Sequence, residues 1–209
     1  MDAAWAAKEL GCTRFIGAGS QAEYGPSDQE KIGPDTLENP VTPYGVSKLA
    51  AGKLSRIFCQ ELEMEWIWCR IFSVYGIYDK ESTMVMTALR QFLNGEETAF
   101  TPAEQQWDYL YSKDAGRAMY LAGEKGKSGS VYCVGSGKSH RLREYIYKIR
   151  DIAACEAEPG IGKKSYPPHS VMHLCADIES LTRDTGFAPR YGFSEGIEEM
   201  VQWLREKNK

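Results

Sequence analysis

The hydrophobic positions of the chain follow two periods that alternate along the sequence. Residues 14–19 (RFIGAG) and 66–72 (WIWCRIF) form nearly continuous apolar runs, which are typical of parallel strands covered by helices on both faces. Between these runs, apolar residues recur at helical spacing from Val46 to Leu62. Thr42 stands in the capping position of this helix, and Pro43 lies in its first turn. The order strand, helix, strand predicts an α/β fold.

The same alternation continues toward both ends of the chain. Asp2 is predicted to cap a short helix that closes at Gly11, and Ser82 to cap a helix that ends at Asn94-Gly95. The other predicted elements are an extended piece at 98–100, a strand at 107–111, a helix from Ser112 to Glu124, a strand at 130–135, a helix at 142–154 and, after a Pro-, Gly- and Lys-rich stretch from Glu158 to His169, two terminal helices. This order predicts a doubly wound parallel sheet with a smaller lobe in the second half.

One part of such a sheet is not found in the sequence. A complete dinucleotide-binding fold opens with a strand, a glycine-rich turn and a helix whose N-terminus holds the pyrophosphate. Nothing before Arg14 has this pattern, and the glycines of GAGSQAEYG (17–25) lack the required spacing at a helix start. We therefore predict a truncated doubly wound sheet that lacks its first β-α-β units.

A long polar loop and the helix after it carry the residues best suited to chemistry. The loop runs from Ser20 to Val41, and long loops inside compact domains usually carry function. Tyr44 and Lys48 stand four residues apart, so they share one face of the helix about one turn apart. A nearby cation favours the phenolate form of a tyrosine, which makes the pair a candidate general base. Ser20 follows a strand and a glycine turn, where its hydroxyl would point into the same cleft.

Composition and charge exclude several other classes of protein. The 209 residues are 43% hydrophobic, which is normal for a globular protein. The 25 Lys and Arg against 29 Asp and Glu leave a net charge of -4 with no basic block, so we expect no nucleic-acid partner. No apolar run reaches membrane-spanning length and the N-terminus does not resemble a signal peptide, so we expect no membrane partner and a cytoplasmic location.

The cysteines and histidines do not indicate a metal site. The six cysteines include no CxxC pair, and most stand in apolar runs, so we expect neither disulfides nor zinc. His169 and His173 have a spacing that suits a metal on a helix, but Pro167-Pro168 precede them and no carboxylate stands between them. We predict no metal ligands.

Six segments, taken in order, resemble the landmarks of a known family. They are GAGSQAEYG (17–25), PYGVSK (43–48), CRIFSVYG (69–76), QQWDYLYSKDAGRA (105–118), VYCVGSGKS (131–139) and ADIESLTRDTGFAP (176–189). Together they are similar to the extended short-chain dehydrogenases/reductases, which are NAD-dependent epimerases, dehydratases and reductases of sugar nucleotides. Each motif alone is weak evidence, and the order of the whole set carries the resemblance. It implies a Rossmann-like domain and a cofactor that is NAD or NADP.

The resemblance also implies roles for individual residues. Ser20 matches the catalytic Ser/Thr, Tyr44 the acid/base, and Lys48 the residue that binds the nicotinamide ribose and favours the tyrosinate. Phe72 matches a position that packs near the nicotinamide, although it is equally well suited to an ordinary core position. Ser20, Gln21 and Ser73 match positions that lie beside the sugar nucleotide. The implied reaction oxidises a sugar hydroxyl to a transient keto-sugar, with Tyr44 taking the hydroxyl proton.

Several residues depart from the family's pattern. Dehydratases carry an Asp-Glu pair after the catalytic Ser/Thr, whereas this chain has Gln21-Ala22, so epimerisation or oxidoreduction is expected rather than loss of water. Ser73 stands where many epimerases have Asn, and Trp107 where many have a diphosphate-binding Arg. A second such Arg is missing from PPHSVMH (167–173). The candidates to replace this clamp are Arg141, Arg143, Lys163 and Lys164.

Two functions of different classes remain open at this stage. One is an NAD(P)-dependent epimerase or oxidoreductase of nucleotide-linked sugars. The other is a catalytically incompetent fragment that acts at most as a binding or assembly module, because the glycine-rich loop is missing. A truncated sheet would expose an apolar edge, so a partner chain that covers it is a further alternative.

The resemblance also predicts the division of the chain and its assembly. Residues 1–75 are expected to be the remaining part of the NAD(P)-binding domain, and residues 76–209 mainly the substrate-binding lobe, with 107–124 returning to the sheet. A homodimer through the helix that bears Tyr44 and Lys48 is expected, because the family often dimerises there and the helix has apolar residues to spare.

Overall fold

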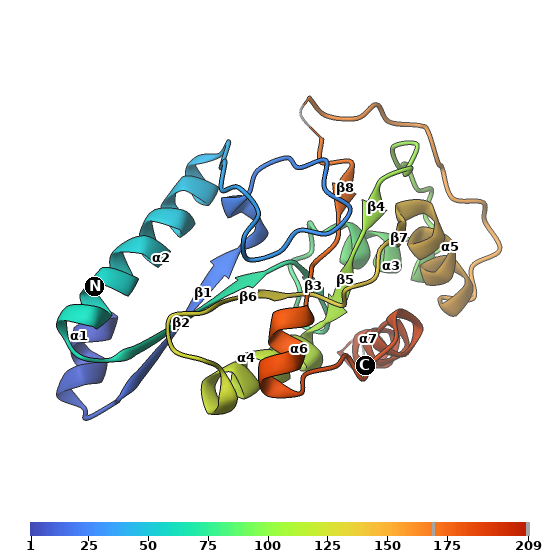
Figure 1. Cartoon of the computed structure of the whole chain (residues 1–209). Coiled ribbons are helices and arrows are strands. Elements are labelled where there is room, and N and C mark those ends of the chain that lie inside the picture. Colours follow the sequence, from blue (N-terminus) through green and yellow to red (C-terminus); the bar gives the residue numbers. More distant parts are fainter. Residues whose placement is uncertain (169, 208–209) are drawn as a thin grey trace.

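A sheet of three parallel strands forms the centre of the structure, a computed structural model that describes residues 1–168 and 170–207. Strand β1 (Arg14–Ser20) pairs with β2 (Glu65–Ile71) from Arg14↔Glu65 to Ser20↔Ile71, and β2 pairs with β6 (Val131–Val134). Helix α2 (Pro43–Glu61) connects β1 with β2, and α4 (Ser112–Lys125) precedes β6 (Figure 1). The predicted α/β fold with a parallel sheet is confirmed.

Helices cover this sheet on both faces because successive residues of β2 point to opposite sides. Trp66 and Trp68 pack in one cluster with Cys59 of α2 and Ala4 of α1 (Asp2–Glu9). Ile67 and Cys69 pack in another cluster with α4 and with α6 (Glu179–Thr185). The two indoles lie stacked, with ring centroids 6.1 Å apart. Figure 1 shows α1 and α2 on one side of the strands and α4 and α6 on the other.

The second half of the chain adds two small sheets and a separate helical core. Strand β3 (Ser73–Tyr75) pairs with β5 (Tyr109–Tyr111), and β4 (Gln106–Trp107) lies between β7 (His140–Arg141) and β8 (His173–Leu174). Helices α3 (Met84–Leu93), α5 (Leu142–Ile152) and α7 (Phe193–Lys207) supply most of a second hydrophobic core, which includes Leu89, Ile149 and Met200. Figure 1 shows these helices beside the small sheets, away from α1 and α2.

Several predicted element boundaries are wrong. The first helix is preceded by Met1 and already contains Asp2, and it ends at Glu9 rather than Gly11. Thr83 rather than Ser82 caps α3, since its hydroxyl accepts the N–H of Met86 at 3.4 Å. Residues 98–100 form no strand. The predicted strand at 107–111 is two short strands in different sheets, separated by the fully buried Asp108.

Among the described residues, β1 forms one edge of the central sheet and β6 the other. Within residues 1–168 and 170–207, β1 pairs only with β2. The loop after β1 begins with a short 3-10 helix, η1 (Gln21–Glu23), and reaches the far lobe, where Ile32 forms a β-bridge with Ala176. Among the described helices, none is long and apolar enough to cross a membrane.

Candidate active site

Ser20 is fixed at the carboxyl end of β1 by a hydrogen-bonded turn. Its Oγ accepts the N–H of Ala22 at 3.2 Å, and its own N–H donates to Glu23 Oε1 at 2.8 Å. This reciprocal pairing is a capping box at the start of η1. Ser20 is 8% exposed, so the turn holds a nearly buried hydroxyl at the end of a central strand.

Glu23 holds this turn against strand β2. The residue is fully buried, and its carboxylate accepts hydrogen bonds from Trp68 Nε1 at 3.0 Å and from Arg70 Nε at 2.7 Å, both on β2. A buried carboxylate needs a cation and further donors to offset its lost hydration. Glu23 therefore ties the backbone of Ser20 to the central strand of the sheet.

The network continues from Arg70 to α2. Arg70 also pairs with Glu38, and Glu38 Oε2 lies 2.6 Å from Lys53 Nζ on α2. Burial raises the pKa of Glu38, but the hydrogen bonds from Lys53 and Arg70 outweigh this effect and lower the pKa below its ordinary value. Glu38 thus attaches the loop between η1 and α2 to both β2 and α2 through ionic contacts.

Tyr44 and Lys48 lie in the first turns of α2, next to the Ser20 turn. The Thr42 hydroxyl caps the helix by accepting the N–H of Gly45 at 3.0 Å. A Cβ atom on Gly45 would overlap the carbonyl oxygen of Ala22, so only glycine lets the helix start so close to η1. The predicted spacing of Tyr44 and Lys48 therefore places both residues beside the end of β1.

Lys48 contacts β1, the strand that ends at Ser20. Its Nζ donates to the carbonyl oxygen of Ala18 at 2.9 Å and lies 5.8 Å from the centroid of the Tyr44 ring. Tyr44 is 58% exposed, and its phenol is accessible to solvent. The structure thus brings Ser20, Tyr44 and Lys48 to one end of β1, an edge strand of the sheet.

Phe72 and Ser73 lie where β2 passes into β3. Phe72 is 5% exposed and packs in a cluster with Tyr24 and Ile32. This burial agrees with the alternative that Phe72 is an ordinary core residue. Its contact with a cofactor stays a prediction. Ser73 Oγ accepts the indole N–H of Trp107 at 2.8 Å, so two of the residues that depart from the family's pattern contact each other. Gln21 lies half-buried in η1, directly after Ser20.

Most of the cations considered as phosphate ligands already have acidic partners. Arg143 pairs with Glu104, and Arg141 Nη1 lies 3.8 Å from the same carboxylate. Lys163 Nζ lies 3.8 Å from Glu97. These pairs leave less cationic charge for a diphosphate at those positions than the sequence suggests.

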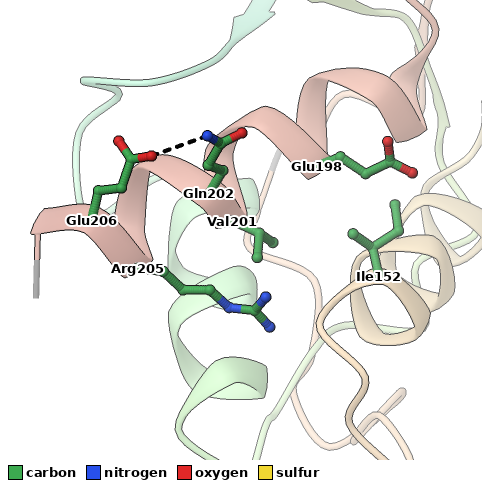
Figure 2. Close-up of a pocket in the computed structure, with 6 residues that line it drawn as sticks. All are labelled: Ile152, Glu198, Val201, Gln202, Arg205 and Glu206. Atoms are coloured by element: carbon green, nitrogen blue, oxygen red, sulfur yellow. Dashed lines mark hydrogen bonds between the residues drawn. The ribbon is translucent and has the colours of Figure 1, made fainter.

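A pocket between α5 and α7 lies outside this group of residues (Figure 2). It has a volume of about 390 Å³ and is lined by Ile152, Glu198, Val201, Gln202, Arg205 and Glu206. Gln202 donates a hydrogen bond to Glu206 at 3.0 Å, and the charged side chains around the pocket have both signs. We assign it no part in the candidate site, because none of the predicted site residues lines it.

The structure contains no candidate metal centre in the part that it describes. No group of three or more His, Cys, Asp or Glu side chains there is arranged to hold an ion. His173 Nε2 is in hydrogen-bond contact with the carbonyl oxygen of Glu30 at 2.7 Å. His169, the other member of the predicted pair, lies outside the described residues.

Comparison with known proteins decides the family. The sequence pattern of the "NAD dependent epimerase/dehydratase family" matches residues 2–135, which is more than half of the chain. The chain belongs to this family. The resemblance to extended short-chain dehydrogenases/reductases is thereby confirmed, and the epimerase/dehydratase family depends on NAD.

Individual members of the epimerase/dehydratase family are distant in sequence but close in fold. The dTDP-D-glucose 4,6-dehydratase of Mus musculus is 23% identical over 207 residues, which cover 96% of this chain. The structure of UDP-glucose 4-epimerase from Thermotoga maritima with UDP-glucose superposes with a TM-score of 0.90 at 22% identity over 99% of this chain. UDP-glucuronic acid 4-epimerase from Bacillus cereus, in complex with NAD, gives a TM-score of 0.86 at 22% identity over 99% of this chain.

The chain matches only part of these family members. It spans 58% of the length of the mouse dehydratase and 68% and 66% of the two epimerase chains. The superpositions confirm the predicted Rossmann-like fold. The sequence prediction did not include Glu23, Trp68 or Arg70, which hold the Ser20 turn, although the spacing Ser20-x-x-Glu23 is itself the signal of a capping box.

Proposed function

We propose that this chain carries the acid/base half of an NAD(P)-dependent epimerase or oxidoreductase of nucleotide-linked sugars. The observation that supports the proposal is the convergence of Ser20, Tyr44 and Lys48 at the end of β1, where Lys48 already contacts Ala18. On this proposal, residues 1–75 form the cofactor side of the site and residues 76–209 mainly the substrate side, with 107–124 returning to the sheet.

Each of the three residues has a chemical task that suits its placement. Tyr44 is exposed and accepts the proton of a sugar hydroxyl, while the ammonium of Lys48 favours the phenolate. Ser20 donates its hydroxyl to the sugar oxygen as that oxygen becomes a carbonyl. Return of the proton from Tyr44 to the oxygen, together with a hydride that the reduced nicotinamide would supply to the carbon, would convert the keto-sugar back to an alcohol and complete an epimerisation; release of the keto-sugar instead would leave a net oxidation.

The residues around Tyr44 fit the nicotinamide end of a dinucleotide. Lys48 offers N–H donors to ribose hydroxyls, and its ammonium already lies at β1, where it donates to Ala18. When bound, nicotinamide supplies the acceptor for the hydride that leaves the sugar carbon. The proposal includes NAD or NADP as cofactor and a nucleotide sugar as substrate, and it keeps Phe72, Gln21 and Ser73 near those ligands.

Loss of water is not part of the proposed reaction. Gln21 and Ala22 follow Ser20, and an amide and a methyl group supply neither the acid nor the base that elimination requires. The mouse relative is a dehydratase by name. The reaction that we propose for this chain therefore differs from the one named for that relative, because of the residues at positions 21 and 22.

Titration of the purified chain with NADH and NADPH, followed by nicotinamide fluorescence, tests the proposed cofactor site. We expect saturable binding that Lys48→Ala weakens about tenfold or more, because the variant loses its donor to the ribose. Lys125→Ala, which removes an exposed lysine in the last turn of α4, serves as the control. Folded protein that binds neither nucleotide contradicts the proposal.

Incubation with NAD and UDP- or dTDP-linked glucose tests the reaction. Chromatography and mass measurement of the sugar nucleotide are expected to show an epimer or a keto product with the wild-type chain and no product with Tyr44→Phe. A product lighter by one water contradicts the assignment based on Gln21-Ala22.

A second candidate function is a binding or assembly module without turnover. It is favoured by the open edge of β1 and by the chain's coverage of about half of its curated relatives. Such a module would bind a nucleotide sugar or a partner chain but would bind no dinucleotide. The NADH titration therefore distinguishes the two candidates.

We also propose a homodimer through α2. Val46, Leu54 and Ile57 are each more than half exposed, and they share one face of the helix with the exposed Ala50. A second copy would bury this apolar stripe. Leu54→Glu is expected to convert dimer to monomer in sedimentation velocity, whereas Tyr120→Glu, at an exposed aromatic residue of α4, should not. A wild-type monomer contradicts this part of the proposal.

A further inference from the structure

A single indole ring lies between strand β1 and helix α2. It belongs to Trp68 of β2, which is 5% exposed. A Cβ atom on Gly17 or Gly19 of β1 would overlap atoms of this ring, and a Cβ atom on Gly52 of α2 would lie 2.9 Å from Trp68 Cε2. Three positions without side chains thus form a slot for the indole, and the slot fixes the ring relative to both β1 and α2.

The indole N–H in this slot points at the carboxylate of Glu23. Trp68 Nε1 lies 3.0 Å from Glu23 Oε1 and 3.2 Å from Oε2, so the two oxygens share one N–H. The backbone N–H of Ser20 donates to the same Oε1 at 2.8 Å, and Arg70 Nε donates to Oε2 at 2.7 Å. Donors on both oxygens give the carboxylate a defined rotation, with Oε1 turned toward Ser20.

The rotation of this carboxylate matters because the Ser20 turn sets the direction of the Ser20 hydroxyl. Ser20 Oγ accepts the N–H of Ala22 at 3.2 Å, an arrangement that leaves the hydroxyl proton available for donation to a substrate oxygen. A donor to a reacting oxygen contributes to the rate only when it is held within about 0.5 Å of its productive position. The carboxylate that fixes the turn therefore also fixes the hydroxyl.

Trp66, two residues earlier on β2, provides an internal comparison. Its ring stacks on that of Trp68 with an angle of 5° between the planes, and it is also 5% exposed. Its Nε1 donates to Ser55 Oγ at 2.9 Å, in the second half of α2. The two indoles thus share strand, face and burial, but only the acceptor of Trp68 contacts Ser20.

The Trp68 side chain is not placed to contact a substrate itself. The ring is buried between β1 and α2, and its N–H is taken by Glu23. Any effect of Trp68 on the reaction therefore passes through Glu23 and the Ser20 turn.

We propose that Trp68 is a positioning residue, which orients the Glu23 carboxylate and through it the hydroxyl of Ser20. Its indole N–H supplies a donor to Oε1, whereas Arg70 Nε donates to Oε2. The effect on the reaction rate rests on the proposed function. The orientation of Ser20 does not, because it can be measured without turnover.

Hydrogen exchange of backbone amides, followed by NMR of the 209-residue chain, tests the orientation. Trp68→Phe keeps an aromatic ring in the slot and removes the N–H. Relative to amides inside α4, exchange at Ser20 is expected to become about tenfold faster or more in this variant, and to stay within about twofold of wild type in Trp66→Phe. Equal acceleration by both variants overturns the proposal, and so does no acceleration by Trp68→Phe.

A replacement of matched shape separates the hydrogen bond from packing. Benzothienylalanine in place of Trp68 carries sulfur where the indole has its N–H, so it keeps the shape of the ring and removes the donor. It is expected to accelerate exchange at Ser20 as Trp68→Phe does, and it takes the place of that variant if the phenylalanine leaves the chain unfolded. Unchanged exchange at Ser20 with this replacement overturns the proposal.

The reaction with NAD and UDP- or dTDP-linked glucose tests the consequence for the rate. Loss of the Trp68 N–H is expected to lower kcat about tenfold and to leave KM within about twofold, because the Ser20 hydroxyl acts on the oxygen as it becomes a carbonyl. Trp66→Phe is expected to change neither constant. An unchanged kcat in Trp68→Phe overturns the role in the reaction. A wild-type chain without turnover contradicts the proposed function alone, and the exchange measurement then decides whether Trp68 orients Ser20.

Discussion

Glu23 shows how a buried charge determines the position of a reactive group. Its carboxylate accepts hydrogen bonds from the backbone N–H of Ser20 and from the side chains of Trp68 and Arg70. Arg70 is also buried, at 2% exposure. Removing either partner of such a pair leaves a charge in a place where water cannot solvate it.

We therefore expect Glu23→Ala to lower the free energy of unfolding by about 3–5 kcal/mol. Glu23→Gln should cost less, since an amide oxygen still accepts from Ser20 or Trp68. Urea unfolding measures both changes, and Glu124→Ala, at an exposed position of α4, should stay within about 0.5 kcal/mol of wild type. A loss below about 1 kcal/mol for Glu23→Ala would show that Arg70 finds other partners.

The sequence predicted some of these residues and not others. Tyr44 and Lys48 were predicted because helical spacing places them together and because PYGVSK (43–48) resembles a motif of the family. Arg70 stands inside an apolar run, where a charge indicates a buried partner, but nothing in the sequence says that the partner is Glu23. The contact between Ser73 and Trp107 joins residues 34 positions apart, and single-sequence patterns carry no information about such pairs.

At the scale of elements, the start of α2 depends on a close backbone contact. Gly45 leaves the space in which the Ala22 carbonyl lies, so the helix bearing Tyr44 and Lys48 touches the turn bearing Ser20. A side chain at this position would separate the two elements.

Gly45→Ala is expected to destabilise the fold by about 1–3 kcal/mol and to weaken NADH binding as well. Gly116→Ala makes the matched control, because Gly116 lies inside α4 with nothing near its absent Cβ. There the alanine should stabilise by about 0.5–1 kcal/mol. Urea unfolding of the two variants compares them directly, and equal effects would contradict the role of Gly45.

The loop between η1 and α2 gives the fold a pH dependence. The pKa of Glu38 is lower in the folded protein than its ordinary value, so its contribution to stability is present above an unfolded pKa of about 4.3 and is lost as the pH falls through the folded pKa. Wild type should lose more stability between about pH 6 and about pH 3 than Glu38→Gln does. Urea unfolding at both values checks this, with Glu124→Gln as control. Identical losses in wild type and Glu38→Gln would show that the ion pairs are not maintained in solution.

Element types were more predictable than their partners. The long helices and the strands of the central sheet follow from periodicity. Each helix buries one apolar face, and each of these strands is a continuous apolar run. The strand expected at 107–111 was wrong as one element, since a period of two does not reveal that Asp108 turns the chain between two sheets. Strands of two residues, such as β7 and β8, owe their existence to tertiary pairing rather than to their own sequence.

At the scale of the whole molecule, Asp108 joins three distant segments. Its carboxylate accepts the N–H groups of Ser136 at 2.8 Å, Gly137 at 3.0 Å and Ala176 at 3.0 Å. Burial raises the pKa of Asp108, and these hydrogen bonds oppose that effect. The carboxylate connects the chain after β6 with the chain after β8.

Asp108→Ala is expected to lower the free energy of unfolding by more than about 3 kcal/mol, because each buried donor left without a partner costs about 1–3 kcal/mol. Hydrogen exchange should show faster exchange at Ser136, Gly137 and Ala176 together. Asp28→Ala, at an exposed loop position, is the control. Faster exchange at only one of the three amides would mean that Asp108 does not join the segments.

The strand order β1-β2-β6 has a consequence for synthesis of the chain. Since this order is also the order along the sequence, β1 is synthesised before its partner β2, and β2 before its partner β6. No formed pair has to open to admit a later strand, and the sheet grows in one direction. The growing edge waits 63 residues for its next strand, since Trp68 pairs with Val131. During that wait a nascent chain exposes the edge of β2 that later pairs with β6, which makes this a stage of translation at which a chaperone would have much to protect.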